Sequence, residues 1–506
     1  MDKPKKSSIL KKTVYTIFLL LIGFFVGYNF FSPNSGDTPL PVKNTLYRST
    51  TNANDTIISD HLEEFNGEIF EVKNGDIIMD AVKKAKPGDL IRVYPGSYSE
   101  TVYIDKDNIT FQGVIKDGNW PVLDGKKELN DAFLYSGNGI QIEGFKIINY
   151  KGNGIMGQAG NNFVLRNNWI IDAGVYGIFP QYGKNGLIEY NILTGIEDAA
   201  IYVGMCDNID VLHNEVYGNV AGIEIENSRH CLVENNNAYD NTGGILAFIT
   251  PGLPIKTTYD VIIRNNFVHE NNHENFGAPG SIVSGIPPGT GILVMAADDV
   301  IIENNLISGN KNVGIVITDF ENGGAKASND PESDPNPDNI VILDNIMINN
   351  GTEPIGEVKA LMLTQLSTRG PDILAIGGGT GSTIRDKNKY LTFGLGDFGT
   401  PKIDNTKDVA SFLLDKPAEP RKVSKKELGE YTYFGVCSGC HAYDIRLIGV
   451  PVNIIQMIYK DNPEGMVEYM NKPKNLRDDY PEMPPQNYLS EEAKLAVAEY
   501  MLSLKK

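Results

Sequence analysis

The sequence is poor in basic residues and in cysteine, and both shortages restrict what the protein can do. Of its 506 residues, 45 are Lys or Arg and 64 are Asp or Glu, so the formal net charge is −19. A nucleic-acid partner requires a basic face, and we therefore expect none. Only four cysteines occur, which excludes a scaffold held together by disulfides. The length favours two or more domains.

Long apolar runs are also rare, with one exception near the N-terminus. The uncharged run Thr13–Phe31 follows five lysines, and at about 1.5 Å per residue it approaches the roughly 30 Å hydrocarbon core of a membrane. Lysines before the run, and none directly after it, place the N-terminus in the cytoplasm. No small-residue cleavage site follows. We predict an uncleaved signal-anchor helix within residues 1–31, in a bacterial inner membrane, with the bulk of the chain periplasmic or otherwise extracytoplasmic. A cleaved signal peptide is the alternative.

A repeat follows a polar tether, which we expect over residues 32–60. Segments such as Val-Leu-Arg-Asn-Asn recur about every 22 residues, and later copies are separated by insertions. The aligned asparagines are Asn168, Asn191, Asn214, Asn236, Asn266, Asn305 and Asn345. A second column of Gly-Ile or Ala-Ile pairs runs in register, from Ile155 to Ile315. Short strands at this period, without helices between them, predict stacked β-coils that share one interior. We expect the Asn column to adopt left-handed backbone geometry and to hydrogen-bond from coil to coil.

The start of the repeat region carries a family resemblance. A short helical pattern, which Asp76 is expected to cap and Pro87-Gly88 to end, leads into the segment Pro87–Tyr98. Together with the repeats it resembles right-handed parallel β-helices of the pectate-lyase-like superfamily, over roughly residues 70–400. The resemblance implies a solenoid that cleaves, epimerises or binds polysaccharides, or assists in maturing a metalloprotein. The Asn-Thr-Asp, Asp-Asp and Gly-His-Gly set of the polygalacturonase-like hydrolases is absent, as is the Asp-Pro-His-Asp motif of the alginate epimerases. The repeats therefore predict the fold and not the chemistry.

One face of the predicted solenoid carries a pair of carboxylates. The residue after each Ile of the second column points outward by strand alternation, which places Glu224 and Glu226 on the outer face, about 6.5–7 Å apart at Cα. Such a pair suits glycosidase-like acid–base chemistry or the binding of a cation. Aromatic side chains on the same face, which could stack on sugar rings, are Phe179, Tyr202 and Phe248. The alternative is that long loops after residue 249 cover this face and that both carboxylates bind loop amides.

Two further clusters have weaker patterns. Cys206 and Cys231 are three residues out of phase between adjacent coils, so we predict no disulfide between them. A Pro-rich loop contains four acidic residues whose oxygens could bind Ca²⁺, although a mobile acidic loop is the alternative; they are Asp330, Glu332, Asp334 and Asp338.

The repeat ends near residue 400, and the character of the chain changes there. Residues 401–425 are rich in Lys, Asp and Pro and predict a linker. A stretch with helical periodicity follows, and it contains the c-type haem attachment signature Cys437-Ser438-Gly439-Cys440-His441. Each Cys would form a thioether to the haem, and His441 would bind its iron. A zinc site needs about four ligands, and His441 is the only His after residue 400. A bare Cys-x-x-Cys redox site remains an alternative.

Met483 is the predicted second iron ligand, because it lies between prolines in an extended segment that can press its thioether onto the iron. Residues 426–506 resemble class I c-type cytochromes, which implies His441 and Met483 as axial ligands of one covalent haem c. The segment Gly449–Pro451 takes the place of that family's Gly-Pro turn, with Val450 inserted, and this puts the backbone contact to His441 in doubt. A haem without an open iron position favours electron transfer.

The predicted fold class is therefore mainly β. It consists of a right-handed parallel β-helix (61–400), a linker (401–425) and a small all-α monohaem cytochrome c domain (426–506), with an N-terminal transmembrane helix. The predicted function is single-electron transfer to an unidentified redox partner protein, with the solenoid as a recognition or docking scaffold. Two alternatives stay open. One is a polysaccharide-active lyase, hydrolase or sugar oxidoreductase that uses the haem as electron outlet, and the other is an assembly factor for a metalloenzyme.

Overall fold

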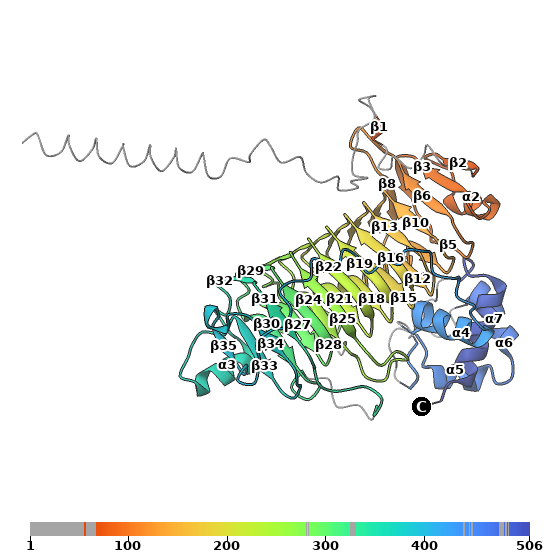
Figure 1. Ribbon diagram of the computed structural model, residues 1–506. Helices are drawn as coiled ribbons and strands as arrows, with labels where there is room; N and C mark the ends of the chain where they lie inside the picture. Colours follow the sequence, from red (N-terminus) through yellow and green to blue (C-terminus); the bar gives the residue numbers. More distant parts are fainter. Residues whose placement is uncertain are drawn as a thin grey trace, which may run out of the picture. The chain divides into compact units, whose positions relative to one another are not determined.

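The protein is built around a long coil of parallel β-strands (Figure 1). The computed structural model describes residues 55–56 and 67–505, apart from 280, 282, 324–329, 439–440, 445, 447–448, 475–479, 481–482 and 484. Within these residues each coil contributes one strand to each of three parallel sheets. Sheets 1, 2 and 3 contain 12, 10 and 11 strands.

Sheet 1 consists of β2 (Ile69–Val72), β3 (Leu90–Val93), β6 (Thr110–Gly113), β10 (Gln141–Glu143), β13 (Val164–Arg166), β16 (Lys184–Glu189), β19 (Asp207–Leu212), β22 (Arg229–Glu234), β25 (Tyr259–Arg264), β28 (Asp298–Glu303), β31 (Val341–Leu343) and β34 (Thr383–Ile384). Sheet 2 consists of β4 (Gly96–Tyr98), β8 (Pro121–Asp124), β11 (Lys146–Ile148), β14 (Trp169–Ile171), β17 (Ile192–Thr194), β20 (Glu215–Tyr217), β23 (Asn237–Tyr239), β26 (Phe267–His269), β29 (Leu306–Ser308) and β32 (Ile346–Ile348). Sheet 3 consists of β5 (Val102–Ile104), β9 (Phe133–Tyr135), β12 (Ile155–Gln158), β15 (Ile178–Gln181), β18 (Ala199–Gly204), β21 (Ala221–Glu226), β24 (Gly243–Phe248), β27 (Thr290–Met295), β30 (Val313–Thr318), β33 (Ile373–Ile376) and β35 (Thr392–Phe393).

The remaining elements lie at the ends of the coil and on its outside. A short antiparallel pair joins β1 (Asp55–Thr56) to β7 (Ile115–Lys116). The helices are α2 (Ile78–Lys84), α3 (Gly356–Thr364), α4 (Lys425–Thr432), α5 (Val452–Ile458), α6 (Pro463–Asn471) and α7 (Glu491–Ser503). Single turns are η2 (Val283–Gly285), η3 (Lys387–Lys389) and the π-turn η4 (Tyr433–Cys437).

The interior of the coil confirms the predicted repeat. Ile155, Ile178 and Ile201 are register partners in neighbouring strands of sheet 3, and the same column continues to Ile315 and Ile373. All of these side chains are fully buried in one continuous apolar core. Because parallel strands stack in register, the same residue type from successive coils meets in the interior.

A buried ladder of asparagines joins the coils, as predicted. The Asn191 side-chain oxygen accepts hydrogen bonds from the backbone N–H and the side-chain amide of Asn168, at 3.0 and 3.1 Å, and the pattern repeats from coil to coil as far as Asn345. The prediction of left-handed backbone geometry was off by one residue. The residue before each ladder asparagine has the positive φ, for example Asn235 before Asn236, at 57°.

A second asparagine ladder was missed. It runs through Asn219, Asn241, Asn271, Asn310 and Asn350, each fully buried and bonded to the next. Each member lies five residues after a member of the first ladder, so the signal was present in the sequence. The two ladders satisfy buried polar groups at two corners of the coils from Asn214 to Asn350.

Helix α2 covers the N-terminal end of the coil, as expected, but its cap differs from the prediction. The Glu100 carboxylate accepts hydrogen bonds from the backbone N–H groups of Ile78 and Met79, both at 2.9 Å. Asp76 instead accepts from Lys73 N, at 2.8 Å. A carboxylate from the next coil therefore stabilises this helix N-terminus.

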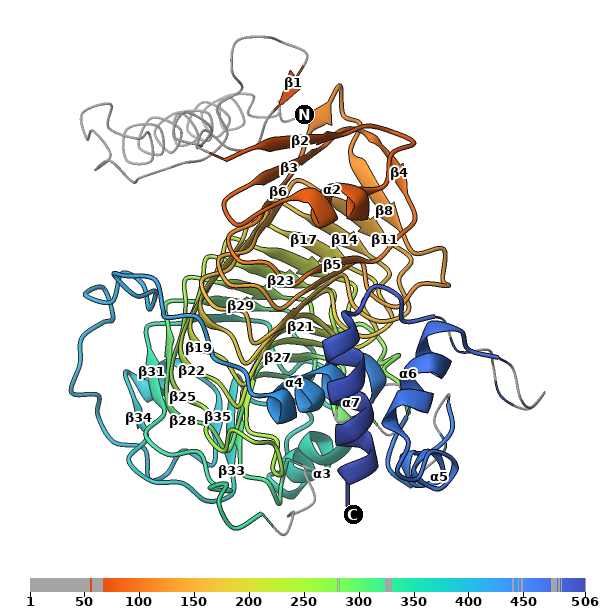
Figure 2. The ribbon, with the colours of Figure 1, turned by 90° about the vertical axis from the view of Figure 1, so that its right-hand side faces the viewer.

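The predicted fold class needs correction in both of its helical parts. Residues 48–506 form one compact unit. Helices α4 and α7 pack on the outer face of sheet 3 (Figures 1 and 2), while α5 and α6 pack against α7, so the helices do not form the predicted separate all-α cytochrome domain. In the part of the chain that the structure describes, no helix is both long and apolar enough to cross a membrane. The segment of the predicted transmembrane helix, Thr13–Phe31, lies outside the described residues.

Candidate functional site

Strand β21 presents two carboxylates to the outer face of sheet 3. Ile223 and Ile225 point into the core, so Glu224 and Glu226 point outward. Both are nonetheless buried, with 1% and 5% of their surface exposed. The structure therefore brings the predicted pair to one side of one strand, beneath a covering layer.

Three aromatic rings lie beside the pair. Tyr202 is the register partner of Glu224 on the adjacent strand β18. Its ring stacks on that of Tyr176, with the ring centres 4.5 Å apart. The centre of the Phe179 ring lies 4.7 Å from that of Tyr176 and 4.6 Å from that of Tyr202. Gly204 is required here, because a Cβ at this position would lie 2.5 Å from the Tyr202 ring and 2.9 Å from Phe179. Phe248, the partner of Glu226 on β24, closes the other side.

Asp198 and Tyr176 complete the cluster, and the sequence analysis missed both. Asp198 lies directly before β18, where its negative charge acts on Glu224, Glu226 and Tyr176. One coil earlier and one coil later the equivalent residues are Val175 and Val220, so a carboxylate interrupts an apolar column. That interruption was the available signal. Asp198 and Tyr176 are partly exposed, so solvent reaches the cluster at their edge.

Burial and mutual repulsion keep protons on these acids. Burial first, and then the nearby Asp198, raise the pKa of Glu226 to about 8. Burial also raises the pKa of Asp198 to about 7, and burial together with Asp198 holds the pKa of Glu224 well above its usual range. The Tyr176 pKa is raised by burial and then by Asp198, Glu226 and Glu224. Acids with a pKa near neutrality can give and accept protons at physiological pH.

The cluster contains polar atoms that the protein does not satisfy. The Oε1 atom of Glu224 is buried without a hydrogen-bond partner among the described residues, and so is Oε1 of Gln181. Gln181 and Glu226 occupy the same column, two strands apart, with Gly204 between them. An unpaired buried oxygen costs about 1–3 kcal/mol. Such a cost is typical of a site where a ligand or water supplies the missing partner. We name Asp198, Glu224, Glu226, Tyr176 and Gln181 the acidic cluster.

Two parts of the chain cover the face around the acidic cluster. Val283, Ile286 and Phe320, from the long loops after residue 249, pack with the outward residues of sheet 3 at one end. Leu428 of α4 and Val436 of η4 pack with them at the other end. Gln158 occupies the same column as Gln181, and its side-chain amide donates to Tyr431 O at 3.3 Å. The predicted insertion loops do cover this face, and the C-terminal helices were the unexpected part of the cover.

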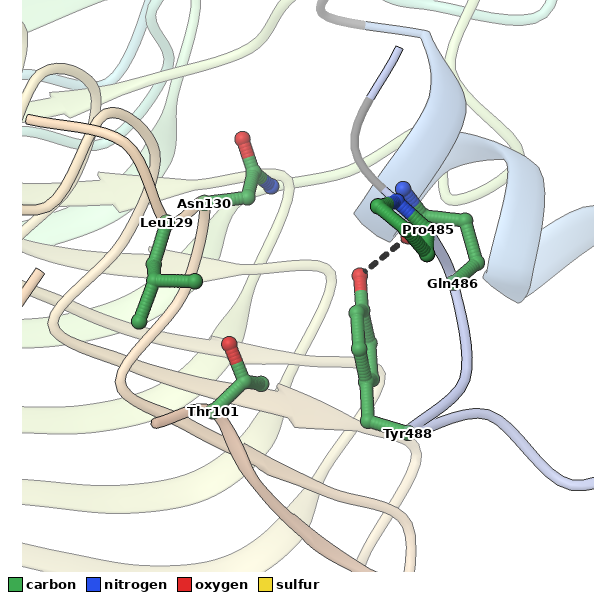
Figure 3. Close-up of a pocket in the computed structure, with 6 residues that line it drawn as sticks. All are labelled: Thr101, Leu129, Asn130, Pro485, Gln486 and Tyr488. Atoms are coloured by element: carbon green, nitrogen blue, oxygen red, sulfur yellow. Dashed lines mark hydrogen bonds between the residues drawn. The ribbon is translucent and has the colours of Figure 1, made fainter. Parts of the chain in front are cut away.

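A small pocket lies between the solenoid and the segment that precedes α7 (Figure 3). Its volume is about 120 Å³, and its lining consists of Thr101, Leu129, Asn130, Pro485, Gln486 and Tyr488. The Tyr488 hydroxyl donates to Gln486 Oε1 at 2.6 Å. The lining holds no carboxylate, thiol or imidazole, so its chemistry does not compete with that of the acidic cluster.

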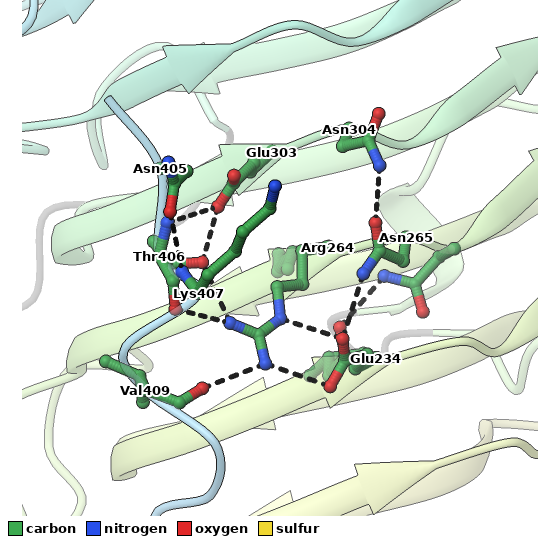
Figure 4. A network of polar contacts seen from close by, with 12 residues as sticks. Glu234, Arg264, Asn265, Glu303, Asn304, Asn405, Thr406, Lys407 and Val409 are labelled. Carbon is green, nitrogen blue, oxygen red and sulfur yellow. Dashed lines mark hydrogen bonds and ion pairs between the residues drawn. The ribbon is translucent and has the colours of Figure 1, made fainter. Parts of the chain in front are cut away.

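Residues 401–421, which belong to the predicted linker, are bound along sheet 1; we name them the C-terminal strap. Arg264 donates to Glu234 at 2.9 and 3.0 Å, and to the Thr406 carbonyl oxygen at 2.7 Å (Figure 4). Glu303 accepts from Thr406 N at 2.9 Å. Further along, the Asp210 carboxylate accepts from Phe412 N at 3.0 Å. The strap leads into α4 and therefore fixes the start of the C-terminal helices against the solenoid.

The predicted haem-binding residues lie in the C-terminal helices, in part within the described residues. Cys437 ends the π-turn η4 and packs, with Met483, against one apolar cluster. His441 Nδ1 lies 2.8 Å from Val450 O, so the backbone contact that the inserted Val had put in doubt is present. A Cβ on Gly449 would lie 2.3 Å from the His441 ring. Cys440 lies outside the described residues, so haem attachment stays a prediction.

The other predicted ligand groups take structural roles. Asp330 accepts from Gly252 N and Lys256 Nζ at 2.7 and 2.8 Å, which ties two loops together. Among the described residues no group of three His, Cys, Asp or Glu side chains could hold a metal ion. Cys206 and Cys231 are buried free thiols, as predicted.

Comparison with known proteins concerns the solenoid. Residues 101–250 and 249–359, just over half of the chain, match the family model described as "right handed beta helix region". No curated protein matches the sequence. Solved structures with a similar fold include the A-module of a mannuronan C-5 epimerase from Azotobacter vinelandii (14% identity, 63% of this chain and 83% of that chain, TM-score 0.43). They also include DFA-IIIase from Arthrobacter chlorophenolicus (14%, 67% and 100%, 0.41) and an exopolygalacturonase from Thermotoga maritima (9%, 56% and 93%, 0.34).

The predicted cytochrome function is corrected by the family match, because the model that matches this chain is that of a right-handed β-helix and it matches residues of the solenoid. At such low identity and TM-score the solved structures carry no argument about what this chain does.

Proposed function

Because this chain belongs to the family of right-handed β-helix proteins, we propose that the outer face of sheet 3 binds and cleaves a polysaccharide at the acidic cluster. The observation that carries the proposal is the unpaired, buried oxygen of Glu224 beside two further acids and three aromatic rings. Hydroxyl groups of a sugar would supply the missing hydrogen bonds, and the rings offer apolar surface to its C–H groups.

The acids divide between two roles. Glu226, with a pKa of about 8, is protonated at neutral pH and suits the general acid that protonates the leaving oxygen. Asp198, with a pKa of about 7, is ionised in a large fraction of molecules and suits the base. General acid–base catalysis contributes roughly 10²–10⁴-fold to such reactions. The three carboxyls together raise the pKa of Tyr176, after burial, and we propose that its hydroxyl positions the sugar.

The test is glycan turnover by the full chain, measured as new reducing ends over a panel of polysaccharides. We expect Glu226→Gln to lower kcat about 100-fold or more, because the amide cannot donate the acidic proton. Glu270→Gln is the matched control, since Glu270 is exposed and lies outside sheet 3. If both variants keep the activity of the unmodified chain, the assignment is wrong.

We also propose that Cys437 and Cys440 bind a haem covalently, and the carrying observation is the contact between His441 Nδ1 and Val450 O. A hydrogen on Nδ1 leaves Nε2 as the nitrogen that can bind a metal. The close approach of Gly449 fixes the ring. Haem that stays with the chain after denaturation, and is lost in the double variant Cys437→Ser/Cys440→Ser, would support this attachment.

A further inference from the structure

Helix α4 rests on sheet 3 directly beside Gln181 (Figure 1). Tyr431 of α4 is buried, and its ring centre lies 4.5 Å from that of Tyr182, the residue after Gln181. The Tyr431 carbonyl oxygen accepts from the side-chain amide of Gln158, which lies one coil before Gln181 in the same column. Gln181 itself is 4% exposed. Helix α4 therefore closes the sheet 3 face at this end of the acidic cluster.

The C-terminal helices share an apolar cluster of their own. It joins η4, α5, α6 and α7, and all of its described members lie after residue 432, among them Tyr433, Val452, Met466 and Val497. Helix α4 belongs to the same body, because it packs so closely on α7 that a Cβ on Gly429 would lie 2.3 Å from Ala496 O. The helices can therefore leave sheet 3 together without exposing this cluster.

An exposed link joins these helices to the strap. The strap is bound as far as Ala418, whose N–H and carbonyl oxygen both lie 2.7 Å from the side-chain amide group of Asn162. Helix α4 begins behind a capping box, in which Ser424 and Glu427 each bind the other's backbone. Residues 422–424, between these two fixed points, are exposed. The chain can therefore change direction at residues 422–424 while the strap stays on sheet 1.

The polar groups under the cover favour an open state. A face that stayed closed in every molecule would be more stable if it were apolar, because a buried polar atom without a partner costs free energy. Oε1 of Gln181 and Oε1 of Glu224 are such atoms among the described residues. Departure of α4 lets water or a ligand reach Gln181 and supply the missing hydrogen bond.

We infer that helices α4–α7 are a displaceable cover, which keeps the sheet 3 face closed to a glycan until it swings away about residues 422–424. The nature of the ligand rests on the proposed function, whereas the cover and its hinge do not. In the closed state α4 occupies the place beside Gln181 where a sugar would lie. The observed affinity then equals the affinity of the open state multiplied by the open fraction.

Opening is measured on the full chain without any ligand. Gln181→Cys places a thiol beside α4, and its alkylation by N-ethylmaleimide is followed by mass spectrometry of the peptide that contains residue 181. Because a buried thiol reacts only when its cover opens, the rate reports the open population. Adding Tyr431→Ala should raise this rate about 10-fold or more, since a buried ring is lost from the contact.

Arg421→Met is a milder change to the same contact. The Arg421 guanidinium carbon lies 5.5 and 5.0 Å from the ring centres of Tyr182 and Tyr431, so its loss should raise the alkylation rate about 3-fold. Lys425→Met is the matched control. It breaks an exposed pair with Glu499, which lies within the C-terminal helices, and should leave the rate unchanged.

Glycan affinity is measured for the same variants with Gln181 retained, by titration calorimetry against hexasaccharides of glucose, mannose and galacturonate. Affinity should rise by the same factor as the alkylation rate. Hydrogen exchange of the α7 amides, such as that of Val497, should stay slow in Tyr431→Ala, because the helices leave as a folded body.

Three results overturn the inference. One is an equal alkylation rate in Tyr431→Ala and Lys425→Met. Another is faster alkylation with unchanged affinity for a hexasaccharide that binds, because the cover then does not control the face. The third is faster alkylation together with lost protection of α7, because the helices then unfold in place. If alkylation accelerates, α7 stays protected and no hexasaccharide binds to any variant, the displaceable cover is supported and the proposed function fails.

Discussion

Removal of the Arg264 guanidinium should release the C-terminal strap while the solenoid stays folded. Arg264 and Glu234 have 9% and 17% of their side chains exposed, and Arg264 joins Glu234 to Thr406 O and Val409 O. In Arg264→Met, the Glu234 carboxylate loses its cation, and breaking one partner of a buried pair costs about 3–5 kcal/mol. Because Asn265 still donates to Glu234, we expect the lower end of that range.

Hydrogen exchange of the strap measures this loss directly. The amides of Thr406 and Phe412 donate to Glu303 and Asp210, so their exchange reports opening of the strap. A loss of about 3 kcal/mol corresponds to roughly 100-fold faster exchange, since each 1.4 kcal/mol is tenfold. The core amides of sheet 3 should keep their rates, because strap opening is local.

Two further variants serve as comparisons. Lys311→Ala removes the ion pair between Lys311 and Glu353, whose side chains are 49% and 67% exposed. It should change the free energy of unfolding by less than about 1 kcal/mol. The double variant Arg264→Met/Glu234→Leu should recover only part of the lost protection, because it removes the unpaired charge while the hydrogen bonds from Arg264 to the strap stay absent. If Arg264→Met leaves exchange at Thr406 unchanged, the strap is held by other contacts and the reasoning is refuted.

Three further predictions concern the ladder, the acids and the thioethers. Asn236→Ala should lower the free energy of unfolding by about 3 kcal/mol in urea titrations, because neighbouring buried groups lose their partners, and a change below 1 kcal/mol would contradict the ladder's role. The raised pKa of Glu226, about 8, means that the folded state takes up a proton. Stability should therefore be complete below the unfolded pKa near 4.3 and fall as the pH rises to about 8, by at most about 1.4 kcal/mol per pH unit. Glu226→Gln should flatten that slope, and an unchanged slope would refute the shift. In Cys440→Ser, a pyridine haemochrome spectrum should show a band for one thioether in place of two, and a chain without haem would refute the attachment.

The repeat region could be predicted from the sequence because its interactions are periodic. In a parallel coil, each residue meets the residue one period away, so a column such as Ile155, Ile178 and Ile201 is visible in the sequence and also touches in space. The outward direction of Glu224 and Glu226 followed from alternation alone. The second asparagine ladder has the same spacing, at a fixed offset from the first, so the same periodicity predicts it.

The rest depended on contacts that have no period. Asp198 joins Glu224 from the turn before its strand, and only the folded coil places the two acids where one raises the pKa of the other. The strap and helices α4–α7 bind the solenoid through side chains such as Arg264 and Gln158, more than 140 residues from their partners. A Lys-, Asp- and Pro-rich composition predicts exposure, and it carries no information about a matching surface elsewhere in the chain.

The sequence by itself thus determined the solenoid, its Asn ladder and the outward carboxylate pair. In a parallel coil, residues one period apart in the sequence are also neighbours in space, so the period alone predicts which residues meet. Only the tertiary structure decided that Asp198 and Tyr176 complete the acidic cluster and that the C-terminal helices cover its edge. These features arise where segments distant in the chain meet, and there burial and charge depend on the whole fold.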